Sequence, residues 1–147
     1  IHSAVMASIF GRLRSISAHL VLFSDQVTDA SALLHSPEDI LLSTQLGGGT
    51  NIGEALAYAR QRLEIPARTA VILISDLFEG YSEDRVLSEV TALKSSGATI
   101  LALAALDLQA DPYYDRNLAQ QLQNCGAQVG AMTPDNLVEW LAQRVHL

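Results

Sequence analysis

Two uninterrupted apolar segments place the strongest limit on the fold. They are TAVILIS (69–75) and TILALAAL (99–106), and the pattern of an amphipathic helix over 82–97 separates them. Apolar runs without alternation are typical of strands that are buried on both faces of a sheet. Because two parallel strands need a crossover connection, usually a helix, this region predicts a β-α-β unit with a parallel sheet.

The same alternation of strand and helix continues through the chain. Strands are also predicted at 19–24, 26–31 and 127–132, a helical turn after Ser36, and helices at 2–16, 51–63, 115–125 and from 133 onward. Such alternation is typical of an α/β fold, a doubly wound and mainly parallel sheet with helices on both faces. The 147 residues suit one domain spanning 1–147.

The start of the chain lacks one expected element. A doubly wound domain of this kind normally begins with a strand, but the helix predicted at 2–16 has no strand before it. The first residue is Ile1, not an initiator methionine, and the apolar pattern is already under way there. We therefore expect an N-terminally truncated fragment of a longer protein, whose first strand lies just upstream of Ile1.

Composition excludes several classes of function. Sixteen acidic residues against nine basic ones give a net charge of −7, which argues against nucleic acid as a partner. The longest apolar run is far shorter than the roughly 20 residues that span a bilayer, so no membrane partner is expected. The single cysteine, Cys125, excludes an internal disulfide and favours a reducing, cytoplasmic setting. The scattered histidines show no zinc-ligand spacing.

A glycine-rich loop, QLGGGTNIGEALAYA (45–59), is the first candidate site. It could hold a phosphate, hold a metal or only begin a helix. Gly47, Gly49 and Gly53 do not match the spacing of a dinucleotide fingerprint, and the chain has no Gly-Lys-Ser/Thr of a P-loop. Nucleotide binding through the GGGT loop, or metal-assisted hydrolysis using Asp76, stays the alternative. We predict that the protein is not an enzyme, because no nucleophile–base pair is evident.

A hard-cation site is the other interpretation of this loop. Thr50 offers a hydroxyl at a helix start, and Asp76 offers a carboxylate directly after the strand at 69–75. Ligands of doubly wound folds bind outside the carboxyl ends of the strands, so we expect these loops to share one edge with the loop at 107–115. Magnesium takes such oxygen ligands. In the alternative, Thr50 only caps the helix and Asp76 only begins a turn.

Four segments in this order resemble a von Willebrand factor A (VWA) domain: HLVLFSDQV, LGGGTNIGEAL, TAVILISDLFEG and TPDNLVEWLA. The likeness covers essentially the whole chain and is greatest to bacterial CoxE-like VWA proteins, which are typically encoded beside MoxR-type AAA+ ATPases. It implies a Rossmann-like VWA fold with a metal-ion-dependent adhesion site (MIDAS) for Mg²⁺ or Mn²⁺. Thr50 and Asp76 match the threonine and aspartate of that site, whereas its Asp-x-Ser-x-Ser motif is absent.

The resemblance also implies a function. It implies a protein-binding adhesion or adaptor domain, whose partner supplies a carboxylate to the metal, working with a MoxR-type AAA+ ATPase in protein assembly or remodelling. Residues around the site are then expected to touch the partner: Gly48, Gly49, Asn51, Phe78, Tyr113 and Tyr114. For the two tyrosines, and likewise for Phe78 and Tyr81, packing of their own loop is an equally open interpretation.

The missing motif and the missing strand have one explanation. In the family the motif ends the first strand, so both would lie immediately before Ile1. In the VWA strand order, 3-2-1-4-5-6, that strand is central and its neighbours correspond to 19–24 and 69–75. We therefore expect the slot between these two strands to be filled by another segment, closed up, or swapped between chains.

Overall fold

The computed structural model describes residues 17–43, 49–105 and 114–132, together with the helical positions Asn136, Glu139 and Gln143. The helix predicted at 2–16 lies outside these residues. Two sheets are present among them: an antiparallel hairpin of β1 (Val21–Phe23) and β2 (Val27–Asp29), and a parallel sheet of β3 (Ala70–Ile74), β4 (Thr99–Ala105) and β5 (Gln128–Met132).

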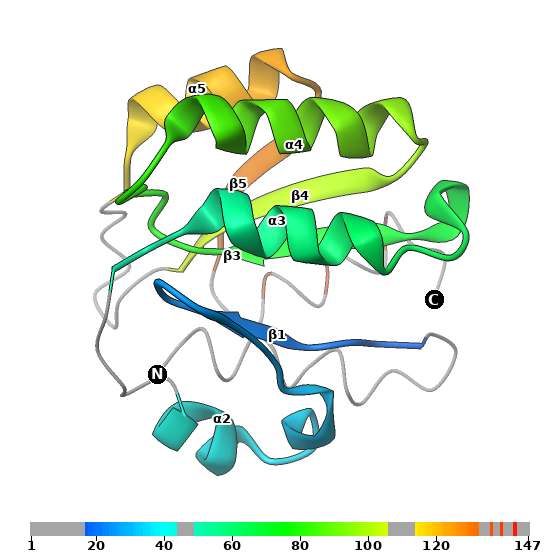
Figure 1. The fold of residues 1–147 in the computed structure, drawn as a ribbon, viewed down its shortest axis with the longest axis vertical. Coiled ribbons are helices and arrows are strands. Elements are labelled where there is room, and N and C mark those ends of the chain that lie inside the picture. Colours follow the sequence, from blue (N-terminus) through cyan, green and yellow to red (C-terminus); the bar gives the residue numbers. More distant parts are fainter. Residues whose placement is uncertain are drawn as a thin grey trace.

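The helices follow the strands as the sequence pattern predicts. They are α2 (Pro37–Ser43), α3 (Ile52–Gln61), α4 (Glu83–Ser95) and α5 (Arg116–Asn124), with short 3-10 turns η1 (Ser31–Leu33) and η2 (Pro66–Arg68). Figure 1 shows α3 lying between α4 and the β1–β2 hairpin, so that this helix connects the two sheets. Within the described residues, no helix has the length and apolar character needed to cross a membrane.

Side-chain caps explain where two of the helices begin. The Ser82 hydroxyl accepts a hydrogen bond from the Arg85 N–H, which confirms the start predicted for α4. The Asp115 carboxylate accepts in the same way from the Leu118 N–H at the start of α5. Each cap satisfies one of the backbone donors that a first helical turn leaves without an intrahelical partner.

The parallel sheet has the order β3-β4-β5, with α4 and α5 as its two crossovers. Its register pairs Ile72 with Leu101 and Leu103 with Gly130. The predicted α/β class is confirmed, because strands and helices alternate around this parallel sheet.

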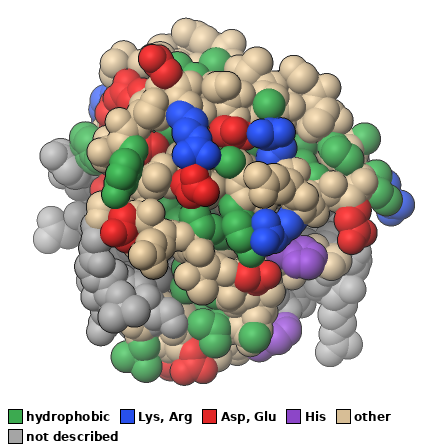
Figure 2. All heavy atoms as spheres, in the orientation of Figure 1, with side chains coloured by type: hydrophobic (Ala, Val, Ile, Leu, Met, Phe, Trp, Pro, Cys, Tyr) green, Lys and Arg blue, Asp and Glu red, His purple; other side chains and the backbone are tan. Residues whose placement is uncertain are grey.

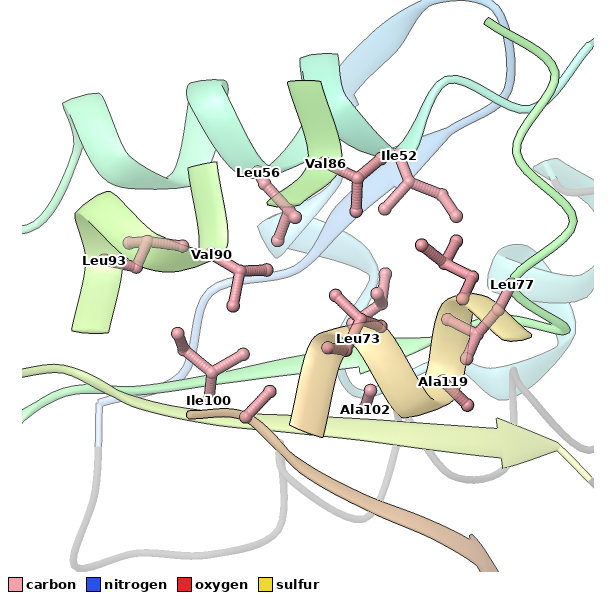
Figure 3. Close-up of a cluster of buried hydrophobic side chains, with 13 residues drawn as sticks. Ile52, Leu56, Leu73, Leu77, Val86, Val90, Leu93, Ile100, Ala102 and Ala119 are labelled. Carbon is pink, nitrogen blue, oxygen red and sulfur yellow. The ribbon is translucent and has the colours of Figure 1, made fainter. Parts of the chain in front are cut away.

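One apolar core lies between this sheet and the helices above it (Figure 3). It takes Leu56 from α3, Val86 and Val90 from α4, and Ile100 and Ala102 from one face of β4. Full burial of a large apolar side chain stabilises a fold by about 1.5–3 kcal/mol, so this core supplies most of the driving force for the region. A smaller cluster under α2 packs Ile40 against residues of β1 and η1.

The two apolar runs differ in how deeply they are buried. Ile100, Leu101, Ala102 and Leu103 of β4 are all buried, as expected for a strand covered on both faces. In β3 only Leu73 is buried, and the rest of that strand is half-buried or exposed. The prediction that 69–75 is buried on both faces is therefore wrong, because β3 is an edge strand of the described sheet whereas β4 has a neighbour on each side.

The slot expected between the strands at 19–24 and 69–75 is only partly covered by the described residues. There, β1 pairs with β2 alone and forms no ladder with β3, so the two strands have not closed up. Filling of the slot by another segment stays a prediction.

Candidate functional site

The loops at the carboxyl ends of the strands meet through backbone hydrogen bonds. The Gly80 N–H, after β3, donates to the carbonyl of Thr50, before α3, at 2.8 Å. The Asp115 N–H, before α5, donates to the carbonyl of Asp76 at 2.9 Å. The expectation that these loops share one edge is confirmed for their described parts.

The turn after β1 joins the same edge. The Asn51 N–H donates to the carbonyl of Ser24 at 2.7 Å, directly beyond the end of β1. Thr50 and Asn51 are thus held from two sides, by the hairpin and by the loop after β3. Much of the glycine loop itself, including Gly48, lies outside the described residues, as does Tyr113.

Asp76 begins a tight turn at the end of β3 and is exposed to solvent. Its Oδ1 accepts a hydrogen bond from the Phe78 N–H at 3.1 Å, and the Ser75 Oγ accepts one from the Leu77 N–H at 3.0 Å. Side chains that bond the backbone two residues on are typical of turns. Within the described residues Oδ2 of Asp76 has no hydrogen-bond partner, so the side chain is oriented through Oδ1 while the residue as a whole is exposed.

Leu77 anchors this turn in the core. It has a positive φ of 65°, a conformation that costs a non-glycine residue roughly 1–2 kcal/mol. Its side chain is fully buried in the core cluster, where Figure 3 draws it near Ala119. Burial of the leucine offsets the backbone strain. The inward leucine therefore fixes Asp76 on the outer side of the turn.

Thr50 is half-buried and does not cap α3. The cap is Asn51, whose Oδ1 accepts a hydrogen bond from the Glu54 N–H at 3.1 Å. The interpretation of Thr50 as the capping residue is therefore wrong, because the helix begins one residue later than that interpretation requires. Among the described residues the Thr50 hydroxyl makes no hydrogen bond, and the start of the helix does not use it.

Glu79 is the residue of this edge that sequence reasoning missed. Its Oε2 accepts hydrogen bonds from the Ile52 N–H at 3.1 Å and the Gly53 N–H at 3.2 Å, and its Oε1 accepts one from the Tyr81 N–H at 3.1 Å. A carboxylate suits a helix N-terminus, where free N–H groups carry partial positive charge. Ile52 lies 27 positions away in sequence, so no local pattern indicates this contact.

Two glycines allow the loops to approach each other closely. A Cβ on Gly80 would lie 3.2 Å from the carbonyl oxygen of Thr50, and one on Gly49 would lie 3.3 Å from the ring of Tyr81. Glycine is the residue expected where two backbones come this near. The predicted partner contact Gly49 therefore packs against the loop that follows Asp76.

The aromatic side chains near this edge differ in how far they are exposed to solvent. Phe78 is 40% exposed and Tyr81 is 60% exposed, both on the loop after β3. Tyr114 is half-buried, packs against the core and lies under the guanidinium of Arg116, 4.9 Å from the ring centre. Packing of Tyr114 against the core is thus observed, and its contact with a partner stays a prediction.

The charged side chains in view form no continuous basic surface. Figure 2 shows basic side chains lying among acidic ones on this face. Two ion pairs among the described residues are Arg60 with Glu89, at 2.6 Å, and Arg85 with Glu54, at 2.7 Å. The described side chains in this view therefore show no continuous basic patch of the kind that binds nucleic acid.

The donor atoms at the edge fit part of a hard-cation site. The Thr50 hydroxyl and the Asp76 carboxylate are oxygen donors of the kind that magnesium and manganese accept. Within the described part of the chain, no three His, Cys, Asp or Glu side chains lie close enough together to hold a metal. Any further protein ligands would have to come from outside those residues.

Comparisons with known proteins agree with this architecture. The family model of the VWA domain containing CoxE-like protein matches residues 1–141. A protein of Escherichia coli K12, named uncharacterized protein YehP, is 48% identical over 145 residues, which cover 99% of this chain and 38% of that protein. The chain therefore spans well under half the length of this relative.

A solved structure shows the same fold at low sequence identity. The crystal structure of an aerotolerance-related membrane protein from Bacteroides fragilis superimposes with a TM-score of 0.72 and 13% identity. The match covers 97% of this chain and 85% of the other. VWA-type domains generally mediate protein–protein interactions and commonly bind a divalent metal. This chain belongs to the family of VWA-domain-containing CoxE-like proteins.

Proposed function

We propose that this chain is a metal-ion-dependent protein-binding domain, with Thr50 and Asp76 as two of the ligands of Mg²⁺ or Mn²⁺. The observation that carries the proposal is the hydrogen bond from the Gly80 N–H to the Thr50 carbonyl, at 2.8 Å. It joins the loop that presents Asp76 to the loop that presents Thr50. Two oxygen donors from separate loops are thereby presented at one edge of the sheet.

The hydrogen bonding of the Thr50 and Asp76 side chains supports this role. The cap of α3 is made by Asn51, so the Thr50 hydroxyl is not used to begin the helix. The Asp76 carboxylate is exposed and oriented through one oxygen only. A hard cation with few protein ligands has coordination positions left for further oxygen ligands. A carboxylate from a partner protein would complete the coordination.

The surroundings suit a protein partner. Phe78 is a partly exposed aromatic residue two positions after Asp76, and aromatic side chains are enriched at protein interfaces. We propose that the partner lies over this edge and contacts the residues around it: Gly48, Gly49, Asn51, Phe78, Tyr113 and Tyr114.

Family membership extends the proposal to the cellular role. We propose that residues 1–147 form one domain, acting in the cytoplasm with a MoxR-type AAA+ ATPase in the assembly or remodelling of another protein. The CoxE-like family supports an ATPase partner of this kind. We propose no enzymatic activity for the domain.

Nucleotide binding through the glycine loop has less support. Phosphate groups commonly bind the free N–H groups at a helix N-terminus. At α3, the N–H groups of Ile52 and Gly53 already donate to the carboxylate of Glu79. A phosphate would have to displace that carboxylate, at the cost of both hydrogen bonds.

Calorimetric titration of the full natural chain tests the proposal. Mn²⁺ or Mg²⁺ should release or absorb heat, and Asp76→Asn should weaken the affinity at least tenfold, about 1.4 kcal/mol. Thr50→Val, which keeps the shape but removes the hydroxyl, should weaken it less. Glu64→Gln, an exposed carboxylate beyond the far end of α3, is the matched control and should have no effect. Binding of ATP or GTP without metal, or wild-type affinity in Asp76→Asn, would overturn the proposal.

A further inference from the structure

We infer that Glu79 is a positioning residue for the proposed metal site, holding Thr50 in place relative to Asp76 without touching the metal itself. The inference rests on the proposed function, because it concerns the geometry of that site. It adds a role in the proposed site to a carboxylate whose hydrogen bonds join the loop after β3 to the start of α3.

The hydrogen bonds of Glu79 divide between two segments of chain. Oε2 accepts from the N–H groups of Ile52 and Gly53, at the start of α3, and Oε1 accepts from the N–H of Tyr81, in its own loop. One side chain therefore ties the loop after β3 to the first turn of α3. The acceptors are charged, and charge-assisted hydrogen bonds are the stronger kind.

These bonds lie close in sequence to the two proposed ligands, two or three residues after Thr50 and five after Asp76. Asp76 stands three residues before Glu79 on the same loop, and its carboxylate is oriented by the Phe78 N–H. Gly80, the residue after Glu79, donates to the carbonyl of Thr50 at 2.8 Å. The segment from Asp76 to Gly80 thus carries one ligand and holds the backbone of the other.

The chemical surroundings of Glu79 leave little room for another role. Its side chain is half-buried, and no Lys or Arg of the described residues forms an ion pair with it. The ion pairs of this region join α3 to α4 through other carboxylates, those of Glu54 and Glu89. The partners that Glu79 does have are backbone N–H groups of the two loops at the site.

Two substitutions of Glu79 give a graded loss of these bonds. Glu79→Ala removes all three acceptor contacts at once. Glu79→Gln retains one carbonyl oxygen for Ile52 and Gly53, but it turns an N–H₂ group toward the Tyr81 N–H, where two donors face each other. We therefore expect the order of metal affinity to be wild type, then glutamine, then alanine.

The test measures Mn²⁺ affinity in the full natural chain, at a temperature at which every variant is folded. Glu79→Ala should weaken binding about tenfold and Glu79→Gln about threefold, which correspond to about 1.4 and 0.6 kcal/mol. The matched control is Glu89→Gln, which removes a carboxylate that joins α4 to α3 far from the loops, and it should bind as the wild type does. In the metal-free protein, hydrogen exchange at the amides of Ile52 and Gly53 should accelerate in Glu79→Ala only.

A double-mutant cycle separates positioning from a general loss of stability. If Glu79 acts through Thr50, Glu79→Ala should change Mn²⁺ affinity less than twofold once Thr50→Val is present, because no hydroxyl is left to position. Full additivity of the two changes would overturn the inference. So would wild-type affinity in both Glu79 variants while Asp76→Asn abolishes binding, a result that leaves the proposed function standing. Absence of Mn²⁺ binding in the wild type would overturn both.

Should Glu79→Ala fail to fold, Glu79→Gln alone decides the question. It keeps the size of the side chain and part of its hydrogen bonding, so it is expected to fold. Mn²⁺ affinity equal to that of the wild type in this variant would then overturn the inference.

Discussion

Strands β3 and β4 are adjacent, parallel and equally apolar in sequence, yet they occupy different environments. Ile72 pairs with Leu101 and Ile74 with Leu103 across the ladder. Both leucines are 1% exposed, whereas both isoleucines are only half-buried. An apolar run therefore identifies a strand, but the number of neighbours that cover it depends on its place in the sheet.

The less covered strand is the one that leads into the candidate site. Directly after β3, Leu77 turns into the core, Asp76 stays in solvent and Glu79 binds the start of α3. The loop is thus fixed by its own side chains at the edge of the sheet. Three predictions test this difference between an edge strand with an ordered loop and a central strand, and a fourth concerns the hairpin. They run from the largest expected effect to the smallest.

Substitution of the paired residues Leu101 and Ile72 by alanine tests the comparison directly. Leu101→Ala should lower the free energy of unfolding by about 3–4 kcal/mol, because it removes a fully buried side chain and leaves a cavity. Ile72→Ala should cost about 1–2 kcal/mol, since part of that side chain is already in water. Urea unfolding measures both. Equal losses would show that β3 is covered as completely as β4 in solution.

Leu77 allows burial and backbone strain to be separated in the loop that follows β3. Leu77→Ala should cost about 2–4 kcal/mol because the core loses a buried leucine. Leu77→Gly should cost no more than that, although glycine is smaller, because relief of the positive φ recovers about 1 kcal/mol. A clearly larger loss for glycine in urea unfolding would mean that the left-handed turn is absent in solution.

Gly80 and Gly49 form a matched pair for the contact between the two loops. Gly80→Ala should cost about 1–2 kcal/mol, because the new Cβ would press on the backbone of Thr50, which is held on both sides. Gly49→Ala should cost well under 1 kcal/mol, because the exposed ring of Tyr81 can rotate away. Thermal unfolding of both variants compares them, and the reverse order would contradict a close backbone contact at Gly80.

The smallest effect is expected at Asp29, on the hairpin away from the parallel sheet. Hydrogen bonds from the backbone N–H and then the hydroxyl of Ser31 hold the pKa of this carboxyl below its ordinary 3.8. Because the folded-state pKa is lowered, the stabilisation is present above about pH 3.8 and is lost as the pH falls through the folded value. The difference in melting temperature between wild type and Asp29→Asn should therefore be small at neutral pH and shrink further in acid. A difference that grows on acidification would contradict the lowered pKa.

Much of the fold could be predicted because its signals are local. The sequence pattern predicted a helix over 82–97, and the Ser82 hydroxyl caps α4 at its start. The meeting of the Thr50 and Asp76 loops followed from the rule that the carboxyl ends of parallel strands share an edge. One error, the helix cap, arose where neighbouring residues competed for the same position. Thr50 and Asn51 are both suitable caps by composition, and only the backbone geometry at 51 assigns the cap to asparagine.

By itself, the sequence determined the α/β class, the order of the elements and the position of Thr50 and Asp76 at one edge. These properties depend on periodicity over a few residues and on a general rule of chain connection. The tertiary structure alone decided that β3 is half-covered and that Glu79 reaches α3. Both depend on contacts between distant segments, 26 and 27 positions apart in the case of Glu79. No local pattern of residues records which distant backbone a side chain will meet, because that meeting exists only after the core beneath it has packed.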